Sequence, residues 1–65
     1  GYRELSPKET DDINTIKAAG ITLEYLLNAL NNEAHYDRRW LAIARTDLQT
    51  GLMAATRAVA RPTTF

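Results

Sequence analysis

The sequence contains no cysteine, a single histidine and no glycine-rich loop, and each absence removes a class of function. Without cysteine there is neither a disulfide framework nor a thiolate metal site. Because His35 is the single histidine, a multi-histidine metal cluster is excluded. His35 stands in a polar stretch, and the sequence has no thiol that it could activate. The three glycines lie far apart, so they do not form a phosphate-binding loop. We therefore expect a protein that is not an enzyme and that uses no metal or other cofactor.

Long apolar runs are also missing. No stretch approaches the roughly 18 to 20 apolar residues that a membrane span requires, and charged residues follow closely on Gly1, unlike in a signal peptide. These features predict a cytosolic protein without membrane contact. The net charge is zero and there is no basic stripe, which argues against a partner such as duplex nucleic acid.

The length allows one domain, residues 1–65, and a chain this short buries a core only marginally. Since the composition excludes disulfides and metal clusters, association between copies is the remaining means of stabilisation. Charge is unevenly distributed, because residues 1–36 carry three basic and six acidic side chains, whereas residues 37–65 carry five basic and two acidic ones. Two antiparallel helices built from these halves would attract each other along their exposed edges.

The first helix is predicted to start at the segment SPKE. Ser6 is a capping residue, Pro7 fits the first helical position, and Glu9 completes a capping box. Apolar positions then recur at steps of three and four, which is typical of one buried helix face: Ile13, Ile16, Gly20, Leu23, Leu27, Leu30 and Ala34. Gly20 on this line leaves two explanations open, either a kink that divides the segment or the close approach of another helix.

A second helix is predicted from Arg38 to Ala60, with Asp37 as its cap and Pro62 as its stop. Its apolar line has the same spacing and comprises Leu41, Ala44, Leu48, Gly51 or Leu52, Ala55 and Val59. No segment shows the alternation of a strand. The predicted fold is all-α, a small helical hairpin with a short or kinked first helix and a long second helix, which assembles into a compact homo-oligomer.

Three polar side chains near the middle of the second helix are candidate ligand contacts. At 100° per residue, Arg45 and Gln49 fall in a strip beside the apolar line, at the boundary between the packed face and solvent. With Thr46 they offer a guanidinium, an amide and a hydroxyl, which suit phosphate oxygens and base edges. A hydrogen-bond network between subunits explains the same residues equally well.

Tyr2 and Lys17 are two further candidates. Tyr2 precedes the first helix and lies off its apolar line, so its ring either stacks on a nucleobase or covers the helix start. Lys17 follows Ile16 and lies off the buried face, where its ammonium either contacts a phosphate or is solvated.

With these residues identified, the chain resembles the anti-CBASS protein two family of small phage proteins. The resemblance rests on YREL, on INTIKAAG and above all on RWLAIARTDLQTGLMAATRAV, whose arginine, threonine, glutamine, glycine and methionine are not dictated by helix patterning. It implies an α-helical protein that forms compact homohexamers in the cytoplasm of the infected bacterial host. Such proteins bind cyclic dinucleotide and trinucleotide immune signals without cleaving them, and so inhibit CBASS defence.

The same resemblance assigns roles to the candidate residues. Tyr2 matches the ring that stacks on a base of a cyclic dinucleotide between two subunits, and Lys17 matches the lysine near its phosphates. Arg45, Thr46 and Gln49 match a cyclic trinucleotide site where three subunits meet. The connection NNEAHYD is short, which indicates an abbreviated member of the family.

Two other functions stay open at this level. One is an oligomeric helical interaction or regulatory module without a small-molecule ligand. The other is a small DNA-binding regulator, for which only the segments DRR and RAVAR approach a basic face.

Overall fold

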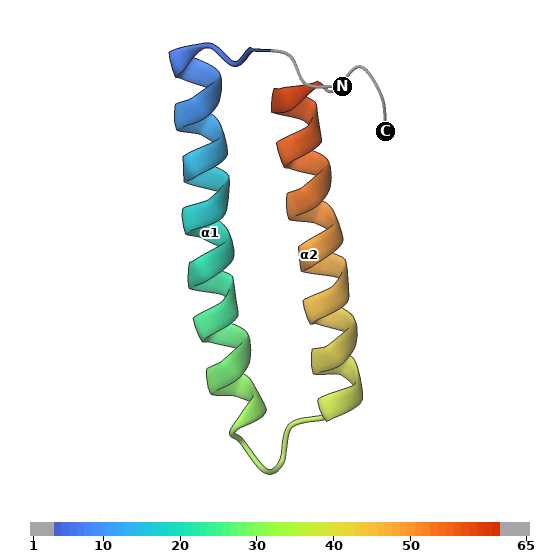
Figure 1. Ribbon diagram of the computed structural model, residues 1–65. Coiled ribbons are helices and arrows are strands. Elements are labelled where there is room, and N and C mark those ends of the chain that lie inside the picture. The colour runs from blue at the N-terminus through green and yellow to red at the C-terminus, as the bar shows by residue number, and fades with distance from the viewer. Residues whose placement is uncertain (1–3, 62–65) are drawn as a thin grey trace.

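A computed structural model describes residues 4–61, and these residues form an antiparallel helical hairpin (Figure 1). Helix α1 spans Pro7–Asn31 and helix α2 spans Arg38–Ala60, and residues 32–37 connect them. The predicted all-α hairpin is confirmed, and the bounds of α2 agree with the prediction. Neither helix is long and apolar enough to cross a membrane.

Both helices begin at side chains that cap their first turns. Ser6 Oγ accepts a hydrogen bond from the Glu9 backbone N–H at 3.2 Å, and Glu9 Oε1 accepts one from the Ser6 N–H at 2.8 Å, which completes the predicted capping box. Asp37 Oδ1 accepts hydrogen bonds from two backbone N–H groups of the first turn of α2, at 2.9 and 3.2 Å. These bonds satisfy donors that have no partner within a helix.

Helix α2 ends at Ala60, and Arg61 takes a left-handed conformation with φ of 44°. The Arg61 N–H still donates to the Arg57 carbonyl at 2.7 Å. A residue before a proline is disfavoured in the right-handed helical region, and Pro62 follows Arg61 in the sequence. Pro62 itself, the predicted stop, lies outside the described residues.

The first helix is neither short nor broken at Gly20. It runs for 25 residues and is longer than α2 with its 23, so the predicted short or kinked first helix is wrong. The alternative explanation for Gly20, close approach of another helix, is the correct one. A Cβ added at Gly20 would lie 3.4 Å from Leu52 Cδ1. Leu52 of α2 therefore packs over the position where Gly20 has no side chain.

The helices meet along a narrow line that we call the interhelical seam. It consists of the apolar side chains that are buried or partly buried between the helices: Ile13, Ile16, Leu23, Leu27 and Leu30 of α1, and Leu41, Ala44, Leu52 and Val59 of α2. Leu27, which is 6% exposed, is the only buried residue among residues 4–61. The seam therefore holds the hairpin in register but forms a very small core.

Part of the predicted apolar line lies outside the seam. Leu48 and Ala55 of α2 are exposed, and Ala34 lies exposed in the connection. The partly buried face of α2 instead follows a seven-residue repeat through Leu52 and Val59. The same repeat begins at Arg45, which brings this cation to the edge of the seam.

The hairpin is elongated and presents apolar side chains to solvent. Its extents are 46 × 21 × 11 Å and its radius of gyration is 14.8 Å, whereas a compact chain of this length has about 11 Å. The large apolar side chains on its outer faces are Ile21, Tyr25, Leu26, Tyr36, Trp40, Ile43, Leu48 and Met53. A core of one buried residue, as found in the described part of the chain, is too small to stabilise an isolated domain of this size.

Replacing Gly51 by alanine is expected to raise the free energy of unfolding by about 1 kcal/mol, because alanine favours the helix and a Cβ added at Gly51 meets nothing within 4 Å. Gly20→Ala should gain less, since its methyl group must be accommodated against Leu52. Urea unfolding followed by circular dichroism measures both variants. An equal gain at the two glycines would contradict the close approach at Gly20.

Candidate functional site

Arg45 extends from α2 across to α1, where two side chains hold its guanidinium. Its Nη1 donates to Glu24 Oε2 at 2.7 Å, and its Nη2 donates to Asn28 Oδ1 at 2.9 Å. The Arg45 side chain is 33% exposed and that of Glu24 is 54% exposed. These bonds use two of the five N–H donors that a guanidinium carries. Arg45 is thus both a cross-helix tie and a cation at the protein surface.

The Arg45–Glu24 pair joins the basic half of the chain to the acidic half. A second cross-helix pair of the same polarity, Arg61 with Glu9, is longer at 3.9 Å. Both agree with the attraction predicted from the charge distribution. Because these groups are partly solvated, each pair contributes about 1 kcal/mol or less to stability.

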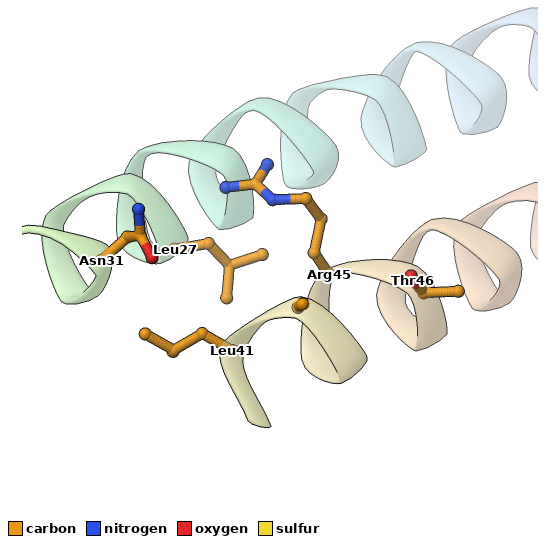
Figure 2. A pocket seen from close by; sticks show the side chains of 6 residues that line it. Leu27, Asn31, Leu41, Arg45 and Thr46 are labelled. Atoms are coloured by element: carbon orange, nitrogen blue, oxygen red, sulfur yellow. The ribbon is translucent and has the colours of Figure 1, made fainter. Parts of the chain in front are cut away.

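Arg45 also borders a hollow between the helices, near the connection (Figure 2). The hollow has a volume of about 260 Å³ and is lined by Leu27, Asn31, Leu41, Ala42, Arg45 and Thr46. In Figure 2 the Arg45 side chain reaches toward α1, whereas Thr46 points along α2. Sites for small molecules usually have about 300–1,000 Å³. A single chain therefore does not enclose a ligand as large as a nucleotide at this position.

The predicted group of Arg45, Thr46 and Gln49 is brought together in part. Arg45 and Thr46 line the same hollow. Gln49 is exposed, one turn beyond Arg45, and it does not line that hollow. Thr46 also borders a shallow depression on the outer face of α2, together with Arg39 and Asp47.

Lys17 is exposed on α1 and borders an open hollow with Gly20, Ile21, Glu24 and Tyr25. Its side chain makes no hydrogen bond or ion pair with any residue from 4 to 61. Lys8 differs, because its Nζ donates to Asp12 at 2.8 Å, and this hydrogen bond and the Asp12 charge raise the pKa of Lys8. Within the described chain, the Lys17 ammonium is thus available to an external anion.

The predicted stacking residue, Tyr2, lies outside the described residues. The open hollow of Lys17 is also lined by an aromatic residue, Tyr25, which is 72% exposed. The predicted site did not include Tyr25, although its position two turns beyond Lys17 places both residues on neighbouring strips of the helix.

Glu24 and Asn28 are the other residues that the sequence reasoning missed. They are four residues apart, so they lie one turn apart on α1 and present two acceptors to the same guanidinium. The available signal was a pair of polar residues beside the apolar line in the acidic half of the chain. Residues 4–61 contain no group of three or more His, Cys, Asp or Glu that could hold a metal ion, and His35 lies exposed in the connection.

Two comparisons with known proteins agree with this hairpin. Residues 1–60 match the protein family described as "Acb2/Tad1, hairpin domain". The chain is also 32% identical to Anti-CBASS protein 2 of Pseudomonas phage JBD67, in an alignment that covers 95% of this chain and 89% of that protein. The alignment extends over 96 positions, so part of the relative has no counterpart among the 65 residues of this chain. The family resemblance inferred from the sequence is confirmed.

Arg45→Met is expected to lower the free energy of unfolding by about 0.5–1.5 kcal/mol, because methionine keeps an apolar stem but loses both hydrogen bonds to α1. Arg57→Met is the matched control, since Arg57 is exposed on the same helix and its loss affects only the helix dipole, by a few tenths of a kcal/mol. Urea unfolding compares the two variants. Equal effects would show that Arg45 is not a tie between the helices.

Proposed function

The chain belongs to the Acb2/Tad1 hairpin family, and from this membership we propose that it inhibits CBASS antiphage defence by binding cyclic oligonucleotide signals. The match of nearly the whole chain to an anti-CBASS protein carries this proposal. The protein acts in the cytoplasm of the infected bacterial host, where it withholds the signals from their effector. Sequestration requires a tight site and no group that breaks bonds, so the protein is a sponge and not an enzyme. A Kd near 1 μM corresponds to a binding free energy of about −8 kcal/mol.

The cyclic dinucleotide site is formed by Tyr2 and Lys17. An exposed lysine without a partner in the described chain suits a phosphate, which supports this assignment. Tyr25 adds a second aromatic ring to the site, since it lines the same hollow as Lys17. The hollow around Lys17 is open in one chain, and we assign its missing wall to a neighbouring subunit.

The cyclic trinucleotide site is formed by Arg45, Thr46 and Gln49. The guanidinium and hydroxyl that line one hollow support it, whereas the small volume of that hollow requires further walls. Three copies that meet at Arg45 would supply them. In a symmetric assembly each cation is repeated, so a chain without net charge still presents a local positive site to a ligand with three phosphates.

The same geometry supports self-association, and the family resemblance implies a homohexamer. Within residues 4–61, one buried residue and eight large exposed apolar residues support association, because other copies would cover the outer faces. A ligand bound between subunits would stabilise the assembly further by mass action.

Calorimetric titration with 3′,3′-cyclic GMP–AMP and then with cyclic triadenylate tests the proposal. We expect binding of both ligands with Kd at or below about 1 μM, and recovery of both ligands intact by chromatography. The two stoichiometries separate a site between two subunits from a site shared by three. Release of linear products would identify an enzyme, and the absence of heat with both ligands would favour a helical interaction module without a small-molecule ligand.

Lys17→Met is expected to weaken dinucleotide binding at least tenfold and to leave trinucleotide binding within twofold, because only the first site loses a cation. Lys8→Met is the control on the same helix, since Lys8 is already paired with Asp12. Calorimetry with both ligands measures the two variants. Equal losses for Lys17→Met and Lys8→Met would mean that Lys17 contributes only to the general charge of the surface.

Leu26→Glu is expected to dissociate the assembly, because it places a charge on the outer apolar surface, where Leu26 is 50% exposed in one chain. Asn14→Glu adds the same charge at an exposed polar position of α1 and should leave the assembly intact. Light scattering coupled to gel filtration gives the mass of each variant. A wild-type protein that remains a monomer at about 100 μM, where proteins with Kd near 1 μM are associated, would contradict self-association.

A further inference from the structure

In the structure the guanidinium of Arg45 is already paired with an anion, the carboxylate of Glu24. The distance of 2.7 Å between Arg45 Nη1 and Glu24 Oε2 is that of a charge-assisted hydrogen bond. Phosphate and carboxylate oxygens are alternative partners for the same guanidinium donors. Asn28, the second acceptor, is uncharged.

We propose that Glu24 is an internal competitor, which a ligand phosphate must displace from Arg45 while Asn28 keeps the guanidinium oriented. This inference rests on the proposed trinucleotide site and adds to it the residue that sets its affinity and selectivity. A single phosphate gains little by replacing a carboxylate that is already bound. A cyclic trinucleotide offers three phosphates in one molecule, so displacement at three copies of Arg45 is driven together.

The exposures of the two partners identify which one moves. Glu24 is 54% exposed, so its carboxylate can turn into solvent, where water replaces the lost hydrogen bond. Arg45 is 33% exposed, and its second donor remains bonded to Asn28. Displacement therefore leaves Arg45 in place and removes the negative charge from it.

The same carboxylate has a role before the ligand arrives. Where three subunits bring Arg45 together, three cations repel each other, and one Glu24 beside each of them neutralises that repulsion. The competitor thus stabilises the empty site and weakens the occupied one. A residue with a purely structural role would stabilise both states.

Two isosteric substitutions with opposite predicted effects test the inference. Glu24→Gln removes the charge but keeps an acceptor for Arg45, and we expect cyclic triadenylate to bind about three- to tenfold more tightly. Asn28→Asp adds a second carboxylate beside Arg45, and we expect binding to weaken by a similar factor. Glu33→Gln is the control for charge, because the Glu33 side chain makes no hydrogen bond or ion pair with any residue from 4 to 61. It should leave affinity within about twofold.

Thermal unfolding of the same proteins distinguishes competition from loss of structure. Without ligand, Glu24→Gln should melt at a lower temperature than wild type and Asn28→Asp at the same or a higher temperature, so their stabilities change in the direction opposite to their affinities. Glu24 also borders the hollow of Lys17 without pairing with it. The gain of Glu24→Gln for 3′,3′-cyclic GMP–AMP should therefore be smaller than its gain for the trinucleotide.

The results separate this inference from the function on which it rests. Wild-type protein that binds neither cyclic nucleotide overturns both. Wild-type protein that binds cyclic triadenylate, with Glu24→Gln no tighter, overturns the competitor alone. An equal gain for the dinucleotide and the trinucleotide also overturns it, because that pattern reflects the general charge of the surface. If Glu24→Gln does not fold, unweakened binding by Asn28→Asp overturns the inference.

Discussion

Two helices meet along a single line of contact, and in this chain that line leaves Leu27 as the only buried side chain within residues 4–61. At Gly20 the missing side chain lets Leu52 approach α1 closely, with Leu52 Cδ1 3.4 Å from where a Cβ would lie. Burial on this scale does not offset the conformational entropy of ordering the whole hairpin. The single hairpin therefore leaves apolar side chains exposed on its outer faces, and the proposed assembly would bury them.

The polar contacts reflect the same shortage of buried surface. Arg45 lies at the edge of the seam. It is shielded enough there to hold hydrogen bonds to Glu24 and Asn28, and exposed enough to contact a ligand. Its position results from the seven-residue repeat that also contains Leu52 and Val59. The observed structural role and the proposed ligand-binding role thus fall on one side chain, and the proposed competition with Glu24 is the consequence of that overlap.

The parts of the fold that local chemistry determines could be predicted from the sequence. The capping box at Ser6 and the cap at Asp37 depend on residues within one turn, and the start of α2 at Arg38 follows from them. The course of the helix through Gly20 could not be predicted, because it depends on Leu52, which is distant in the sequence. The periodicity also left open whether Gly51 or Leu52 faces α1.

The candidate site was harder to predict for a related reason. Sequence reasoning placed Arg45 at a boundary, but its partners Glu24 and Asn28 depend on the register of one helix against the other. Lys17 was identified from its position off the apolar line, and it lies exposed as that position predicts. The roles of Tyr2, Gln49 and the neighbouring subunits stay predictions, since they depend on contacts that one chain does not contain.

The connection of residues 32–37 has a consequence for the rate at which the hairpin forms. Loops of about ten residues close in roughly 10–100 ns, and helices form within about a microsecond. Each helix carries its own cap and the two meet through this short loop, a topology of low contact order that favours rapid folding. The proposed association between copies would depend on their concentration and would be the slower process. In the proposed assembly, the rate at which the oligomer accumulates would therefore be governed by the concentration of folded hairpin.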